Sequence, residues 1–247
     1  MRRALVAIAV TLLTGIGTVA ASAAPASAAS LQFLSAGVVQ NGTSAGAFGT
    51  FTVNKPFVVP GDAFSMATMR VFAATQGSVD VGWTVDRALN GDDEPHLFVR
   101  YVNSVDHCQN VCGFHQVDPN LRPGAVLTVN STRRFMIQHF QGNWWVGVDS
   151  VWIGFFPDAL WGNAFTQAAN VQWMGEVLAT EFLPCTEMGS GEVPSAPGVA
   201  TVTDIGYFGG PPVHISAFAQ NTSFYQAAVT GTTSMSYGGR GECNNPI

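Results

Sequence analysis

The sequence predicts an all-β fold in which many short strands form a sandwich or a barrel with one short helix. Segments in which apolar and polar residues alternate with a period of two recur along the chain. Turn-forming clusters such as NGDDEP (90–95) separate these segments. Residues 158–170 alone show a good helical spacing of apolar residues. The pattern favours an all-β class but does not distinguish a sandwich from a barrel.

The expected elements follow one another at short intervals. Residues 30–50 are rich in Gly, Ser and Ala and predict an edge strand or an irregular lead-in. Residues 106–123 form a loop region, and Asp158 is expected to cap the helix 158–170. The remaining segments are expected strands: 65–73, 78–86, 97–102, 125–130, 133–140, 144–149, 151–155, 171–179, 199–208, 214–219, 224–233 and 234–239.

The N-terminus has the pattern of a secretory signal. Arg2 and Arg3 precede an apolar or small stretch over 4–19, and small residues at 26–28 provide a cleavage site after Ala28. A membrane anchor is the weaker alternative, because Thr and Gly interrupt the apolar run. We therefore expect a signal peptide over 1–28, a single domain over 29–247 and a secreted, extracellular protein.

The charge of the chain argues against anionic partners. The formal net charge is −6, the charged residues amount to 11%, and Lys55 is the sole lysine. Only Arg133 and Arg134 are adjacent basic residues beyond the signal segment. We therefore expect neither a nucleic-acid partner nor a membrane partner, and we expect a monomer.

The cysteines fit an oxidising compartment better than a metal site. Cys108 and Cys112 are close enough for a tight bridge, and a bridge between Cys185 and Cys243 would tie the C-terminus to the rest of the chain. The alternative is a metal site that uses these thiols with nearby histidines, His107 and His115. No second closely spaced Cys or His pair completes a tetrahedron, so we expect no metal and no cofactor.

Two carboxylates have an unusual setting. Asp80 is expected on the strand face opposite Trp83, and Glu176 on the face opposite Trp173. A carboxylate without a partner is costly to place among apolar groups. The functional interpretation is a catalytic pair, and the alternative is a pair of solvated residues on the polar face of a sheet.

Each of these two carboxylates has a glycine nearby. Gly82 lies two residues after Asp80, and Gly175 directly precedes Glu176. Glycine in a strand can allow the backbone of a ligand to approach closely, which supports the catalytic interpretation.

The chain resembles the neprosin family, secreted proteins that include a proline-cleaving glutamic endopeptidase. The matching motifs occur in the family's order and cover roughly residues 50–243. They are DVGWTV (80–85), LFVRYV (97–102), CQNVCGFHQV (108–117), GNWWVGV (142–148), IGFFP (153–157), VQWMGEV (171–177), MGSG (188–191) and YGGRGEC (237–243).

The resemblance implies a fold, disulfides and a site. It implies an antiparallel β-sandwich with Cys108–Cys112 and Cys185–Cys243 disulfides. It also implies two catalytic acids: Glu176 matches the family's second glutamate, and Asp80 holds the position of the first. We expect no N-terminal activation segment of the kind that the plant relatives have, so the resemblance is to a bacterial-type secreted member.

The mechanism implied is hydrolysis of a peptide bond in a peptide or protein substrate, without metal. Glu176 would act as general base on water, and a protonated Asp80 would hydrogen-bond the oxyanion. Two carboxyls that share a proton favour acidic pH. Since aspartate is one methylene shorter than glutamate, we expect weak activity that is confined to acid and improves with Asp80→Glu.

Two alternatives from other classes remain. Paired carboxylates also serve glycoside hydrolysis, and aromatic residues stack on sugars. A non-catalytic secreted binding module with the same fold would also be rich in tryptophan.

Overall fold

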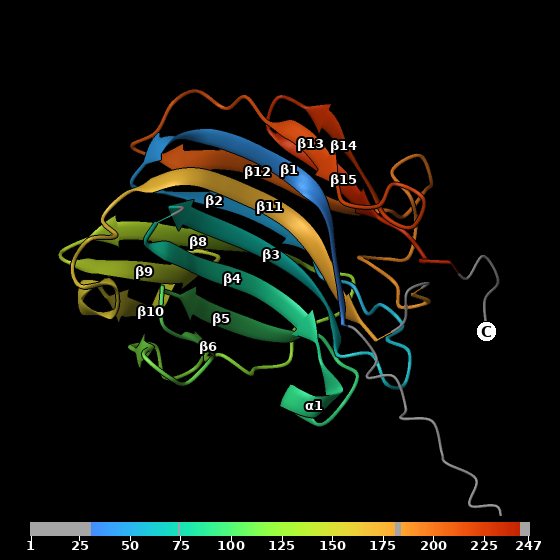
Figure 1. Ribbon diagram of the computed structural model, residues 1–247, viewed down its shortest axis with the longest axis horizontal. Helices are drawn as coiled ribbons and strands as arrows, with labels where there is room; N and C mark the ends of the chain where they lie inside the picture. The colour runs from blue at the N-terminus through green and yellow to red at the C-terminus, as the bar shows by residue number, and fades with distance from the viewer. Residues whose placement is uncertain (1–30, 74, 181–183, 243–247) are drawn as a thin grey trace, which may run out of the picture.

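The protein is a sandwich of two antiparallel β-sheets, as the computed structural model shows for residues 31–73, 75–180 and 184–242 (Figure 1). The predicted fold class is therefore confirmed, including the antiparallel pairing of the strands. The expected signal peptide over 1–28 lies outside the described residues. No helical segment in the described part of the chain has the length and apolar character needed to cross a membrane.

The front sheet in Figure 1, here called sheet A, has seven strands in the order β13-β1-β11-β3-β4-β5-β6. Four central strands of this sheet, β11, β3, β4 and β5, carry the candidate site. The bounds are β1 Gln32–Ser44, β3 Phe64–Ala73, β4 Gly77–Val85, β5 His96–Val102, β6 His107–Gln109, β11 Ala168–Ala179 and β13 Ser216–Ala219.

The rear sheet, sheet B, has eight strands in the order β14-β15-β12-β2-β8-β9-β10-β7. It packs behind sheet A along the whole length of the sandwich (Figure 1). The bounds are β2 Gly46–Thr52, β7 His115–Gln116, β8 Thr132–Phe140, β9 Asn143–Val148, β10 Val151–Pro157, β12 Ala200–Phe208, β14 Gln226–Gly231 and β15 Ser234–Gly238.

Two tryptophans of sheet A anchor it to sheet B through hydrogen bonds. Trp83 Nε1 donates to the carbonyl oxygen of Thr52 at 2.9 Å, and Trp173 Nε1 donates to that of Phe48 at 3.2 Å. Both acceptors belong to β2. The indoles are fully buried, so each N–H meets a partner inside the core. The expected alternation on β4 and β11 is thus confirmed: the tryptophans face the core.

The N-terminal region differs from the expectation of an edge strand or lead-in over 30–50. Strand β1 lies between β11 and β13, inside sheet A, and β2 lies between β12 and β8, inside sheet B. The small residues of this region suit close packing. At Gly37 of β1, for instance, a Cβ would lie within 2.5 Å of the Met174 side chain.

The helix predicted over 158–170 is wrong beyond its first turn. A 3₁₀ turn, η1 (Asp158–Trp161), ends at Gly162, and both Gly162 and Asn163 adopt left-handed φ values of about 60°. Two successive left-handed residues cannot continue a right-handed helix. The expected Asp158 cap is absent, since its carboxylate contacts His139 Nε2 at 3.0 Å instead.

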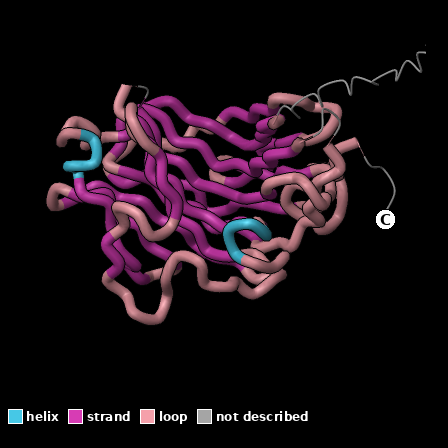
Figure 2. The backbone as a smooth tube through the Cα atoms, turned by 60° about the horizontal axis from the view of Figure 1, so that its bottom comes forward, coloured by secondary structure: helices cyan, strands magenta, loops and turns pink. Residues whose placement is uncertain are grey.

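Two smaller differences concern strands and helices. The strand expected over 125–130 is reduced to one bridge between Val126 and His96. One α-helical turn, α1 (Arg87–Asn90), follows β4, and Asp86 caps it. Figure 2 shows that the helical turns are small connections between long strands.

Candidate active site

Four charged side chains come together on the outer face of sheet A, the face away from sheet B. They are Asp80 on β4, Glu176 on β11, Arg70 on β3 and Arg100 on β5. Asp80 lies directly opposite Arg70 on one side and Arg100 on the other. Side chains at such positions are immediate neighbours, so strand pairing alone places Asp80 between two cations.

The carboxylate of Asp80 binds both arginines. Arg70 Nε lies 3.2 Å from each carboxylate oxygen of Asp80. Arg100 donates from Nε at 2.9 Å and from Nη2 at 2.5 Å to Oδ2. Charge-assisted bonds of this kind are stronger than neutral ones, so Asp80 holds the two guanidinium groups in place.

Glu176 reaches the same arginines from another row of the sheet. It lies opposite Met66 on β3, four residues from Arg70 along that strand. Arg70 Nη2 donates to its carboxylate at 3.0 and 3.4 Å, and Arg100 Nη2 lies 3.5 Å from Oε2. The predicted pair of acids is therefore brought together, with two arginines between its members.

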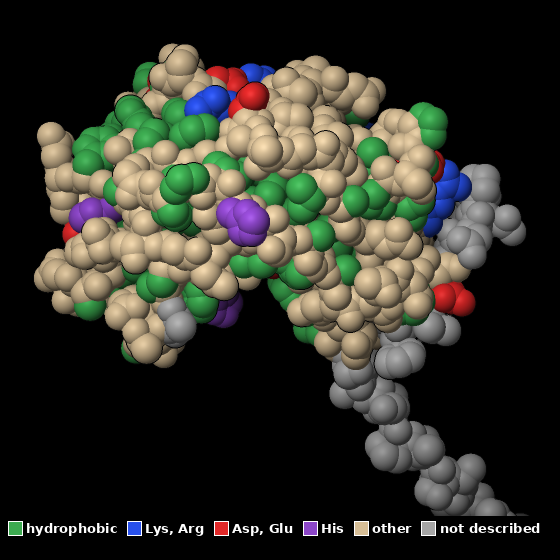
Figure 3. Space-filling model, turned by 90° about the horizontal axis from the view of Figure 1, so that it is seen from above, with side chains coloured by type: hydrophobic (Ala, Val, Ile, Leu, Met, Phe, Trp, Pro, Cys, Tyr) green, Lys and Arg blue, Asp and Glu red, His purple; other side chains and the backbone are tan. Residues whose placement is uncertain are grey.

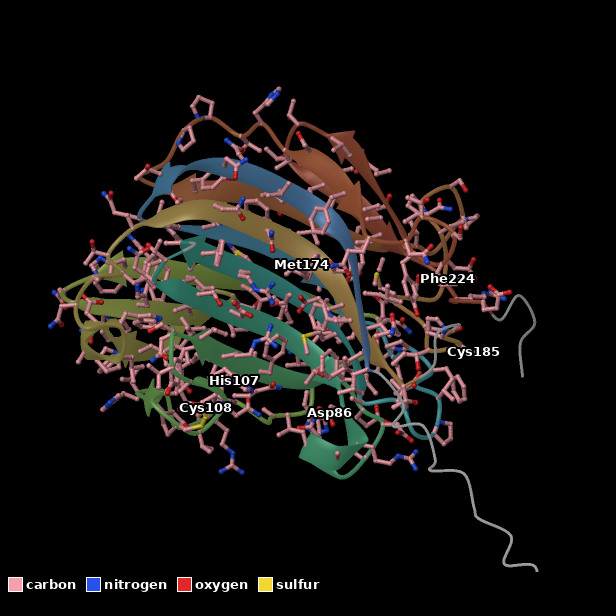
Figure 4. All side chains as sticks on the ribbon, in the orientation of Figure 1. Asp86, His107, Cys108, Met174, Cys185 and Phe224 are labelled. Carbon is pink, nitrogen blue, oxygen red and sulfur yellow. A yellow bond between two sulfur atoms is a disulfide. The ribbon has the colours of Figure 1, made fainter. Side chains whose placement is uncertain are left out.

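Within the cluster, the arginines are partly exposed to solvent and the acids are not. The side chains of Asp80 and Glu176 are fully buried, whereas those of Arg70 and Arg100 are 20% and 13% exposed. The two acids are therefore not solvated residues of a polar face. In Figure 4 this face of the sheet is toward the viewer, with Met174 labelled on β11. Seen from above, the outline of the molecule is indented on the same side (Figure 3).

The ionisation of Asp80 follows from these contacts. Burial opposes the charged form, but the charges of Arg70 and Arg100 and hydrogen bonds from Arg100 and Ser78 outweigh it, so the pKa of Asp80 is lowered. The expectation that Asp80 shares a proton with Glu176 does not fit this arrangement. An ionised Asp80 only accepts hydrogen bonds, so neither its predicted donor role nor activity confined to acid follows from the structure.

Two buried polar atoms near the cluster lack partners within the described residues. Thr84 Oγ1 is on the outer face of β4, in the row of Glu176. Gln109 Nε2 is on β6, in the strand position opposite Arg100. Buried polar groups in native proteins normally have partners. Both atoms are themselves buried, so they are unpaired groups beneath this face and not donors or acceptors on its surface.

The two glycines do not have the role predicted for them. A Cβ at Gly175 would lie 2.6 Å from Met188 and 2.7 Å from Tyr237, both in the core. A Cβ at Gly82 would overlap the carbonyl oxygen of Ala67 on β3. Protein atoms, and not a ligand, therefore occupy the space that each glycine leaves, and both residues serve strand packing.

The cysteines behave as a disulfide framework. Cys108 and Cys112 are bonded, with a Cα–Cα distance of 5.9 Å. Because their sulfurs are joined, neither is a thiolate ligand for a metal with His107 or His115. Cys185 is also disulfide-bonded, and its expected partner, Cys243, lies outside the described residues.

Sequence reasoning missed the two arginines. Arg70 is a single cation in an otherwise uncharged strand, and Arg100 is the single charge of LFVRYV (97–102). Asp80 and Glu176 were singled out because a charge among apolar groups needs a partner. The same argument applied to the two arginines. Their meeting depends on which strands are neighbours, and alternation within a strand does not provide that information.

A family model supports the resemblance seen in the sequence. The model described as Neprosin matches residues 61–240, which is most of the chain. All four charged residues of the site lie within the matched range.

A comparison with solved structures finds matches at low sequence identity, three of which follow. Scytalido-glutamic peptidase with a transition-state analogue is 11% identical, with 84% of this chain and 98% of that chain covered and a TM-score of 0.49. SCP-B, an eqolisin-family peptidase in complex with a tripeptide, is 10% identical over the same shares, with a TM-score of 0.42. A family 16 endo-glucanase from Bacteroides ovatus is 13% identical, covering 63% and 70%, with a TM-score of 0.37. Likenesses at this level do not carry an activity from one chain to another.

Proposed function

The chain belongs to the Neprosin family, and from that premise we propose that it is a glutamic-type peptidase that hydrolyses peptide bonds with water activated by Glu176. The observation that supports this most is the meeting of Glu176 and Asp80 on one sheet face through shared arginines. The two acids are far apart in the sequence, and the alternation pattern of each strand singles out both of them. We further propose that the protein is secreted, acts as an endopeptidase and cleaves at proline, as the resemblance implies.

In the proposed reaction Glu176 is the general base. Its carboxylate takes a proton from a water molecule while the water oxygen attacks the carbonyl carbon of the peptide bond. Asp80 is a positioning residue in this account. Its carboxylate holds the guanidinium groups of Arg70 and Arg100, so their orientation is fixed before substrate arrives. The reaction needs no metal.

Substrate must displace part of the present network. Glu176 is fully buried and accepts from both arginines, so a water in its reach requires the arginines to turn toward the substrate. The burial of Glu176 by the two arginines also favours a second candidate function. In a non-catalytic secreted binding module, the four charges would be a permanent ion cluster that stabilises the face of sheet A.

A substrate panel distinguishes these functions. Purified protein is incubated with proline-containing and proline-free peptides and with a glycan panel from pH 3 to 8, with and without a chelator. The peptidase proposal expects chelator-resistant peptide cleavage, with faster cleavage of the proline-containing peptides. Cleavage of glycans alone would favour a two-carboxylate glycoside hydrolase, and no cleavage of either class would favour the binding module.

A further inference from the structure

The arginines of the site have hydrogen-bonding capacity that the carboxylates do not use. Each guanidinium group has five N–H donors. Arg70 and Arg100 use Nε and Nη2 for Asp80 and Glu176. Within the described residues, these hydrogen bonds to Asp80 and Glu176 come from Nε and Nη2, and none of them comes from Nη1 of either arginine. Because both side chains are partly exposed, these donors are available to a group that approaches from solvent.

Two further polar atoms beside the arginines lack partners within the described residues, but both are buried beneath the face. Thr84 Oγ1 lies in the row of Glu176, and Gln109 Nε2 lies opposite Arg100. The groups that this site presents to solvent are therefore the cationic donors of Arg70 and Arg100. A peptide, whose backbone contains a carbonyl acceptor in every residue, can place one of these oxygens against such donors.

We propose that Arg70 and Arg100 are catalytic residues that bind the oxyanion of the tetrahedral intermediate, in place of a protonated acid at position 80. This inference rests on the proposed peptidase function and deepens it. A guanidinium group is protonated at every pH at which the protein is folded, so a donor is always present. Preorganised donors at a developing oxyanion are among the largest contributions to catalysis.

The proposed step is the addition of water to a peptide carbonyl. A water O–H bond breaks, its proton goes to Glu176, and the water oxygen forms a bond to the carbonyl carbon. The π electrons of the carbonyl move to its oxygen, and the resulting negative charge accepts hydrogen bonds from Arg70 and Arg100. The C–N bond then breaks, the carbonyl re-forms, and the leaving nitrogen takes the proton back from Glu176. The products are a carboxylic acid and an amine.

A pH dependence follows from the charged groups around the site. The groups on the four central strands are Arg70, Asp80, Arg100 and Glu176. Asp80 is held in its charged form by the two cations, so raising the pH from 4 to 7 removes no proton that catalysis needs. We therefore expect kcat at pH 7 to be at least equal to kcat at pH 4.

Two histidines lie on the flanking parts of the same face. His96 of β5 contacts the carbonyl oxygen of Gly124 and the carboxylate of Asp92, each at 2.8 Å. Its two ring nitrogens are therefore directed at two loops, one before β5 and one between β7 and β8. His107 is exposed at the far end of β6. Neither has a hydrogen bond or ion pair with the four charges of the site.

The first test measures kinetics of arginine variants. Arg70→Gln and Arg100→Gln should each lower kcat by about 100-fold, with KM changed by less than about threefold. Arg133→Gln is the matched control, because Arg133 forms an ion pair with Asp149 at 2.8 Å on the surface, and it should keep wild-type kcat. A folded Gln variant with kcat within about threefold of wild type would overturn the proposal.

Two further measurements keep the proposal testable if the Gln variants do not fold. Arg70→Lys and Arg100→Lys keep the charge and lose the planar fork, so they should fold and still lose kcat by at least tenfold. The wild-type pH profile needs no variant: a fall in kcat of tenfold or more from pH 4 to 7 would point to a protonated acid and overturn the proposal.

Binding of a phosphonate peptide separates this inference from the proposed function. The phosphonate carries the charge and shape of the tetrahedral intermediate, and calorimetry measures its binding without turnover. Wild type should bind it at least tenfold more tightly than the Arg100→Lys variant does. Absence of any peptide cleavage would contradict the peptidase function, whereas equal phosphonate binding by the two proteins would contradict the role of the arginine.

Discussion

At the scale of single residues, Asp80 is the member of the charged cluster whose removal should cost the most stability. It is fully buried and hydrogen-bonded to two arginines. Removing one member of a buried ion cluster leaves uncompensated charge, which costs about 3–5 kcal/mol of unfolding free energy. Asp80→Asn should therefore lower the free energy of unfolding by about that amount, as measured by urea denaturation.

The matched control for this prediction is Asp149→Asn. Asp149 forms an ion pair with Arg133 on the surface, and its side chain is 45% exposed. Exposed pairs contribute less than about 1 kcal/mol. An equal loss of unfolding free energy in the two variants would contradict the prediction that the buried Asp80 contributes more to stability than an exposed acid does.

The stability of the protein should also depend on pH through Asp80. Its pKa in the folded protein is lower than the value of about 3.9 in an unfolded chain. The stability that its charge contributes is therefore fully present above about pH 4 and is lost as the pH falls through the folded pKa. Denaturation curves from pH 7 to 2 should show this loss in wild type. A loss of equal size in Asp80→Asn would contradict the assignment to this residue.

At the scale of elements, the position of Glu176 depends on how β11 is attached to the other sheet. Trp173 lies three residues before Glu176 on the opposite face and donates to the Phe48 carbonyl. Gly49 leaves the space for its indole, since a Cβ there would lie 2.9 Å from Trp173 Nε1. Contacts with sheet B therefore hold the core-facing side of β11 in place, and the charged cluster lies on the opposite, outer face of the strand.

Trp173→Phe tests this attachment. The variant removes one inter-sheet hydrogen bond and leaves a small cavity, so we expect a loss of about 1–3 kcal/mol in unfolding free energy. Trp152→Phe is the control, because Trp152 is half-buried on β10 and contacts Phe140 and Phe208 through ring edges and tilted rings. A loss for Trp152→Phe as large as for Trp173→Phe would contradict the account.

Sequence patterns predicted where individual strands lie better than they predicted which strands pair with one another. Alternation correctly placed Asp80 and Glu176 on faces opposite their tryptophans, because that property is local to a strand. Arg70 and Arg100 were missed because their contact with the acids comes from pairing between distant segments. The helix over 158–170 was wrong because two left-handed residues, Gly162 and Asn163, outweigh its apolar spacing.

At the scale of the whole molecule, the cysteines are predicted to form a complete set of disulfides. Cys108 lies at the end of sheet A beside Tyr101, and it is bonded to Cys112. We expect all four cysteines to be paired, so titration of denatured, unreduced protein should detect no thiol. The reduced protein provides the control with four thiols. Two or more thiols without reduction would contradict the framework.

The central claim for the whole molecule is that Glu176 activates water in a peptidase site, and Glu176→Gln tests it most directly. The amide keeps the shape of the side chain but cannot take a proton, so kcat for peptide hydrolysis should fall at least about 100-fold. Glu94→Gln is the control, because Glu94 pairs with Lys55 on the surface, and it should keep wild-type kcat. Circular dichroism verifies that both variants fold. A folded Glu176→Gln protein that hydrolyses peptides at the wild-type rate would contradict the claim.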